Sequence, residues 1–158
     1  MLNPSTIIFG SKIASVVGMV GTDIIGKTLT TTTKSIMNVI YHLTTTEYPN
    51  SKDIRCIIFD SDIEIKMKII KALVDELNNN NKHVYKYVKI SLDSLTEITE
   101  KIHIELNKIK EKIDYHNSLY FSSWRTLDCN YYLNNLKKYN ILLDKRIDLL
   151  TKLLSINN

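Results

Sequence analysis

Residues 84–116 carry mostly apolar side chains at alternating steps of three and four residues. This spacing places every member on one face of an α-helix, and a helix of that length spans about 50 Å at a rise of about 1.5 Å per residue. An apolar face this long must be buried against other helices, so the pattern predicts a helical bundle. The members of this stripe are Val84, Val88, Ser91, Leu95, Ile98, Ile102, Glu105, Ile109, Ile113 and His116.

Two further segments show the same spacing and predict two more helices. Ser61 and Glu64 match the capping-box pattern at the start of the middle segment. Ser122 or Ser123 suits an N-cap ahead of the last segment. The middle stripe is Ile63, Met67, Ile70, Val74 and Leu77, and the last is Leu133, Leu136, Leu143, Ile147, Leu150 and Leu154.

The first 50 residues differ in composition from the rest of the chain. They carry five charged side chains, whereas the other 108 residues carry 33. We predict a helix over residues 5–43, held by packing because its glycines and threonines weaken helix propensity. Small residues occupy one face of this helix, where another backbone could approach closely. This small-residue face, the leading candidate for a contact surface, comprises Ser11, Ser15, Gly18, Thr22 and Gly26.

Together these patterns predict one domain over residues 1–158, an all-α antiparallel bundle of about four long helices. Residues 1–46 form its apolar, Gly/Thr-rich helical segment, and residues 50–158 form its charged amphipathic helices. The sustained spacing also permits a coiled-coil dimer. Residues 52–60 and 83–90 suit either helix or strand, so a small α/β fold with a short parallel sheet is the alternative.

The segment from Gly21 to Thr28 matches the phosphate-binding pattern GxxxxGK[ST]. In a P-loop, Gly21 and Gly26 permit the turn, Lys27 reaches the outer phosphates, and Thr28 binds Mg²⁺, which Asp60 could also hold. An acidic and two β-branched residues at the variable positions would crowd such a loop. The chain also offers too few strands for a buried parallel sheet. A small nucleotide-binding protein is therefore kept only as the alternative function.

The remaining polar residues form no pattern that predicts catalysis or metal binding. A di-iron bundle needs a second ExxH motif beside that of Glu100 and His103, and the sequence has none. Cys56 and Cys129 lie 73 residues apart without a CxxC pair. We therefore expect no enzymatic activity, cofactor, metal site or small-molecule substrate.

Aromatic residues gather ahead of the last predicted helix, at Tyr120, Phe121 and Trp124. Such a cluster is typical of a binding hot spot and also of an apolar plug at the end of a bundle. The plug is the preferred interpretation, because large aromatic side chains commonly dominate cores. Trp124 is kept as a candidate interaction residue.

Charge and cysteine usage bound the partners and the compartment. The net charge of +4 is mild, and basic and acidic residues alternate, so we expect no nucleic-acid binding. The unpaired cysteines indicate a reducing compartment. The chain also lacks the basic start, unbroken apolar run and cleavage site of a signal peptide. We expect an intracellular protein that is not secreted.

The apolar segment from Ile7 to Leu29 is long enough to cross a membrane and carries small residues at helix-packing spacing. Lys12, Asp23 and Lys27 make a full span costly. Contact of residues 5–43 with a membrane surface is therefore a second alternative function.

Ile, Lys and Asn are unusually frequent, with 23, 18 and 15 copies, whereas Ala appears twice. The chain resembles uncharacterised helical proteins of mimivirus-like giant DNA viruses. The resemblance lies in this bias, in the threonine-rich helix from Gly26 to Ser35 and in the stretch from Tyr120 to Arg125. The resemblance implies a viral origin and a place in the host cytoplasm or the virion, and it transfers no binding or catalytic residue. The expected function is a non-enzymatic structural or protein-interaction module, with self-association or a protein partner. A virion component or a host-interaction factor would fit this expectation.

Overall fold

A computed structural model describes residues 5–48, 51–79 and 84–156, although the side chains of residues 5–23 and of Ser123 lie outside the description. The described residues contain no strand and are 87% helical. The all-α prediction is confirmed, and the α/β alternative is wrong because residues 52–60 and 86–90 are helical. The helices are α1 (Ser5–Thr45), α2 (Ser51–Asp60), α3 (Ile63–Asn79), α4 (Lys86–Ser118), the 3-10 turn η1 (Ser122–Trp124) and α5 (Asn130–Ser155).

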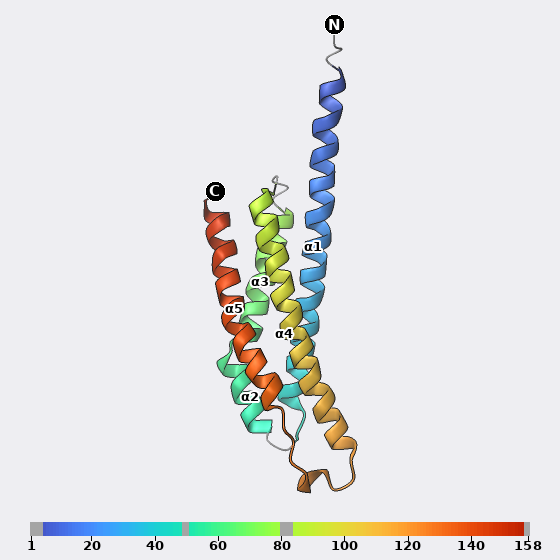
Figure 1. The fold of residues 1–158 in the computed structure, drawn as a ribbon, viewed down its shortest axis with the longest axis vertical. Coiled ribbons are helices and arrows are strands. Elements are labelled where there is room, and N and C mark those ends of the chain that lie inside the picture. Colours follow the sequence, from blue (N-terminus) through green and yellow to red (C-terminus); the bar gives the residue numbers. More distant parts are fainter. Residues whose placement is uncertain (1–4, 49–50, 80–83, 157–158) are drawn as a thin grey trace.

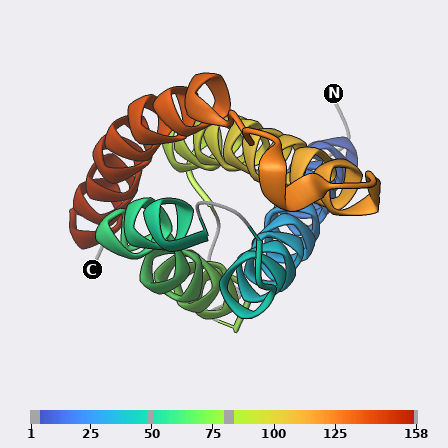
Figure 2. The same ribbon diagram turned by 90° about the horizontal axis from the view of Figure 1, so that it is seen from below.

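The helices form an elongated bundle in which α2 and α3 together make one of four columns (Figure 1). Helix α1 packs against α3 and α4, and α4 packs against α5. Seen end on, α3 and α4 lie on opposite sides of the bundle although they follow one another in the chain (Figure 2). The neighbouring helices α1 and α4 therefore run in the same direction, whereas the pairs α1/α3 and α4/α5 are antiparallel, as predicted.

Helix α4 supplies the largest share of the core. Nearly all of its predicted stripe is buried, and Leu92, Thr99 and Leu106 add a second buried row at seven-residue spacing. Two rows are needed because α4 packs against both α1 and α5. Burying each Leu or Ile side chain contributes roughly 1.5–3 kcal/mol, so this helix anchors the bundle. The α5 leucines of the predicted stripe are likewise buried, with Leu154 partly so.

The break between α2 and α3 differs from the predicted capping box. The Ser61 hydroxyl donates to the Ile57 carbonyl at 2.5 Å, back toward α2. Asp62 then adopts a positive φ of 50°, a conformation that Asp tolerates better than most residues. Ser61 is thus used to end α2, and it does not cap α3.

The start of α5 also lies later than predicted. Neither Ser122 nor Ser123 caps it, because these residues belong to the 3-10 turn and α5 begins at Asn130. The carboxylate of Asp128 accepts a hydrogen bond from the Asn130 backbone N–H at 2.9 Å. Asp128 thereby satisfies one of the free N–H groups of the first turn.

Candidate interaction site at the α4–α5 turn

The phosphate-binding pattern lies inside a continuous helix. Residues 21–28 belong to α1, and the Thr28 hydroxyl donates to the Ile24 carbonyl at 3.0 Å. A P-loop requires backbone N–H groups that are free to face phosphates, whereas here they belong to a helix interior. Gly21, Gly26 and Lys27 share this helix, and Asp60 is an exposed residue at the end of α2. The structure therefore does not form the loop that the nucleotide-binding alternative requires.

One member of the small-residue face has a described environment. A Cβ atom at Gly26 would lie 3.3 Å from Val74 Cγ1 and 3.4 Å from Asn78 Oδ1. This position therefore serves the close approach of α1 and α3 within the bundle. The side chains of Ser11, Ser15 and Thr22, and the surroundings of Gly18, lie outside the description.

The first part of α1 continues beyond the ends of the other helices, as the blue segment of Figure 1 shows. Within the described residues, no helix combines the length and the hydropathy of a membrane span. Most of the segment from Ile7 to Leu29 precedes the first described side chain, that of Ile24. Membrane contact by residues 5–43 stays a prediction.

The aromatic cluster at the turn between α4 and α5 points into solvent. Tyr120 is 91% exposed, Phe121 76% and Trp124 88%, so the predicted plug is wrong. Leu127 and Cys129 are instead the buried residues of this connection. We call the three exposed rings, Tyr120, Phe121 and Trp124, the aromatic turn.

The backbone of the aromatic turn is held in a conformation that is costly for a bulky residue. Phe121 adopts the left-handed region, with φ 60° and ψ 35°, which an L-residue with a large side chain rarely occupies. Its carbonyl accepts a hydrogen bond from the Trp124 N–H at 3.0 Å, and the two ring centroids lie 6.3 Å apart. Backbone strain of this kind is concentrated at functional sites.

The chain after the aromatic turn is tied to α4 by Lys112. Its ammonium group donates to the Asp128 carbonyl at 2.8 Å and lies 5.4 Å from the centre of the Tyr132 ring. Burial raises the pKa of the neighbouring Cys129 thiol above its usual range. The bond from Lys112 therefore fixes the connection on the C-terminal side of the aromatic turn.

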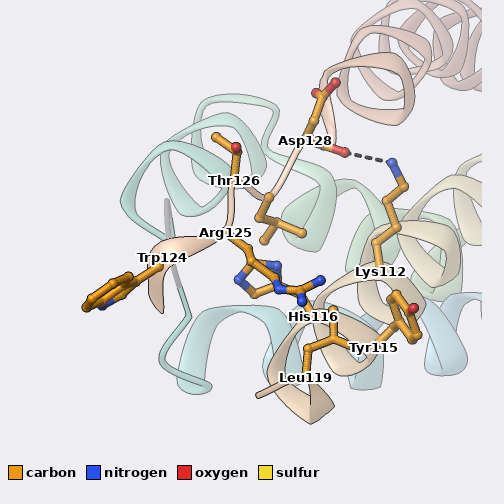
Figure 3. A pocket seen from close by; sticks show the side chains of 9 residues that line it. Lys112, Tyr115, His116, Leu119, Trp124, Arg125, Thr126 and Asp128 are labelled. Atoms are coloured by element: carbon orange, nitrogen blue, oxygen red, sulfur yellow. Dashed lines mark hydrogen bonds between the residues drawn. The ribbon is translucent and has the colours of Figure 1, made fainter. Parts of the chain in front are cut away.

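A pocket of about 430 Å³ lies between the end of α4 and this connection. Figure 3 shows the His116 imidazole and the Arg125 side chain extending into it, whereas Trp124 points outward. His116 is only 5% exposed, and its Nε2 has no hydrogen-bond partner among the described residues. The lining residues are Lys112, Tyr115, His116, Leu119, Trp124, Arg125, Thr126, Leu127 and Asp128.

The spacing of the apolar residues does not indicate the hydrogen-bonding environment of His116 or Lys112. His116 belongs to the predicted stripe and is buried with it, but its Nε2 is unsatisfied among the described residues. Lys112 is exposed, and its ammonium group binds the Asp128 carbonyl of the connection. Sequence reasoning does not select Arg125 as a pocket residue, for which its place directly after Trp124 is the available signal.

Comparison with known proteins places this chain in a viral family. No protein-family model matches the chain, and no solved structure matches it. The chain is 30% identical over 152 residues to the uncharacterised protein L717 of Acanthamoeba polyphaga mimivirus, and this match covers 80% of the chain and 71% of the relative. The resemblance inferred from composition is confirmed: the chain belongs to the mimivirus family that contains L717.

Proposed function

We propose that this protein is a non-enzymatic interaction module that binds a protein partner through the aromatic turn, as a virion component or as a factor acting in the host cytoplasm. The observation that carries the proposal is the simultaneous exposure of three large aromatic rings in one turn. Trp and Tyr are over-represented among the residues that dominate binding energy at protein interfaces. Exposing them gains nothing for folding, since burial is what stabilises an apolar ring.

The strained backbone at Phe121 supports the same conclusion. A residue that tolerates positive φ, such as Gly or Asn, would form this turn at lower cost. The phenyl ring is 76% exposed, so its packing within the described chain does not offset that cost. Selection for a contact outside the chain accounts for both the ring and its position.

The charge pairs along the helices describe the rest of the surface. Many charged side chains are engaged along single helices, as in the i,i+4 pairs of Lys101 with Glu97 and of Lys68 with Glu64. This arrangement suits a solvated surface.

The proposal is tested with a photo-crosslinking amino acid at Tyr120 and, as the control, at Ile141, which is 59% exposed along α5. Crosslinking is performed in infected cells and in purified virions. We expect a discrete protein adduct from position 120 that excess unlabelled wild-type protein suppresses and excess Trp124→Ser protein does not. An adduct of equal intensity from position 141, or equal suppression by both competitors, would contradict the proposal.

A further inference from the structure

We propose that the pocket beside the aromatic turn receives a carboxylate side chain from an acidic segment of the protein partner. This inference rests on the proposed function, because it assigns the chemistry of the partner that covers the aromatic turn. It adds a polar anchor, formed by His116 and Arg125, to the apolar contact surface.

The first argument is the unsatisfied state of His116. Its side chain is 95% removed from solvent and faces the pocket, and Nε2 has no partner in the described chain. Buried polar atoms in folded proteins are nearly always hydrogen-bonded, because an unpaired one destabilises the fold. A ligand oxygen that reaches Nε2 by displacing the atoms that cover it would supply the missing partner when Nε2 carries the proton.

The second argument is the charge of the side chains that line the pocket. Arg125 is exposed and forms no ion pair within the described part of the chain. Of the other charged residues in the lining, Lys112 is engaged by the Asp128 carbonyl, and the Asp128 carboxylate accepts from Asn130 at the start of α5. Both residues keep their charges in these hydrogen bonds, so the lining carries two cations, Lys112 and Arg125, and one anion, Asp128. The guanidinium of Arg125 has no ion-pair partner among the described residues, and its planar fork matches a carboxylate.

The third argument concerns the size of the occupant. A pocket of about 430 Å³ is large enough for one acidic side chain together with part of its backbone. Trp124 contributes to the rim of the pocket, and its ring points outward as part of the aromatic turn. A single bound segment can therefore place its carboxylate in the pocket and its apolar side chains on the rings, whereas a free anion would leave the rings uncovered.

The proposal is tested by nuclear magnetic resonance titration of the full-length protein with two blocked hexapeptides of serine and leucine. One carries a central glutamate and the other a glutamine in its place. The signals monitored are the Arg125 side-chain N–H, the His116 ring and the Trp124 indole N–H. We expect saturable shifts of all three with the glutamate peptide, and at least tenfold weaker binding of the glutamine peptide.

Arg125→Gln is expected to weaken binding of the glutamate peptide at least tenfold, whereas Arg146→Gln, which removes an exposed arginine on α5, leaves it unchanged. Because Arg125 is exposed, its substitution should leave the thermal unfolding midpoint unaltered. His116→Gln is the second variant, and it too should weaken the glutamate peptide. Equal binding of the two peptides, or an undiminished affinity of Arg125→Gln, would overturn the proposal.

Inorganic phosphate serves as the free-anion probe. If phosphate produced the same shifts as the glutamate peptide with equal affinity, the pocket would be a general anion site and the assignment to an acidic segment would be overturned. The two proposals fail separately. In the crosslinking experiment, excess Arg125→Gln protein could suppress the adduct at position 120 fully while excess Trp124→Ser protein does not. That result would support binding through the aromatic turn and contradict the carboxylate anchor.

Discussion

The ammonium group of Lys66 on α3 donates to Oδ1 of Asn140 on α5 at 2.9 Å. Asn140 lies midway between Leu136 and Leu143, where the leucine stripe of α5 would place an apolar residue. The same ammonium group lies 2.7 Å from the carboxylate of Asp144. A polar group at a stripe position can fix the register of helices, and these bonds join α3 to α5.

Replacing Lys66 with Met is therefore expected to destabilise the bundle by about 1–3 kcal/mol, because it leaves the partly buried Asn140 amide without its donor. The measurement is the free energy of unfolding from urea denaturation. Lys68→Met is the control, because the ion pair of Lys68 with Glu64 is exposed and its loss should cost at most about 1 kcal/mol. Equal losses in the two variants would refute a special role for Lys66.

The helical architecture could be predicted from the sequence because burial of a helix face depends on spacing alone. The stripe of α4 and the leucines of α5 are buried as expected. The parallel neighbours α1 and α4 could not be predicted, since the order of helices around a bundle depends on which stripes fit together in space. The bond from Lys66 to Asn140 joins residues 74 positions apart, and only the gap in the leucine stripe pointed to it.

The candidate site was harder to predict because its exposure depends on one backbone conformation. The cluster of Tyr120, Phe121 and Trp124 is visible in the sequence, but nothing there indicates that Phe121 adopts positive φ. With Phe121 in this conformation, the chain forms the 3-10 turn η1, and α5 begins only at Asn130. The three rings of the aromatic turn face solvent. The unsatisfied Nε2 of His116 likewise depends on the path of the connection across the end of α4.

Asp114 is expected to contribute to stability in a pH-dependent way. Its carboxylate meets the imidazole of His42 on α1, with Nε2 and Oδ1 3.2 Å apart, and also binds Lys110. Burial alone would raise the pKa of Asp114, but the hydrogen bonds from Lys110 and His42 together lower it. A carboxyl group with a lowered pKa stabilises the fold when the pH is above its pKa in the unfolded state, about 3.9. This contribution is lost as the pH falls through the pKa of the folded state.

Asp114→Asn should therefore lower the unfolding free energy by about 0.5–1 kcal/mol near neutral pH, a modest value because the carboxylate is partly exposed. The difference from wild type should shrink when urea denaturation is repeated at a pH of about 3. Asp93→Asn is the matched control for an exposed aspartate on α4. A difference that grew on acidification would contradict a lowered pKa at Asp114.

Two glycines of the small-residue face, Gly18 and Gly26, should respond differently to bulk. Gly26→Leu is expected to destabilise the protein by about 1–3 kcal/mol, because a side chain there meets Val74 and Asn78 of α3. Gly18 lies in the part of α1 nearer its N-terminus, and Gly18→Leu should instead disrupt assembly or partner binding. Thermal unfolding and sedimentation equilibrium separate the two effects. Lys27→Ala is the comparison for Gly18→Leu, and a larger assembly defect in Lys27→Ala would rule out this contact surface.

Phe121 offers the sharpest test, because stability and binding should change in opposite directions. Phe121→Asn replaces a bulky residue at φ 60° with one that tolerates the left-handed region. Relief of this strain is expected to raise the unfolding free energy by about 0.5–1 kcal/mol, since a strained residue costs roughly 1–3 kcal/mol. The same variant should lose the crosslinked adduct at position 120, because the ring it removes belongs to the proposed contact surface.

Trp124→Ser is the control for Phe121→Asn. It removes a similarly exposed ring from the same turn without changing a positive-φ position, so it should lose the adduct with no gain in unfolding free energy. A loss of stability in Phe121→Asn would mean that the phenyl ring supports the fold, and the strain would then need no partner to explain it. A gain in stability together with intact crosslinking would place the partner elsewhere on the bundle. Only the combination of a more stable fold and a lost adduct agrees with strain that is retained for binding.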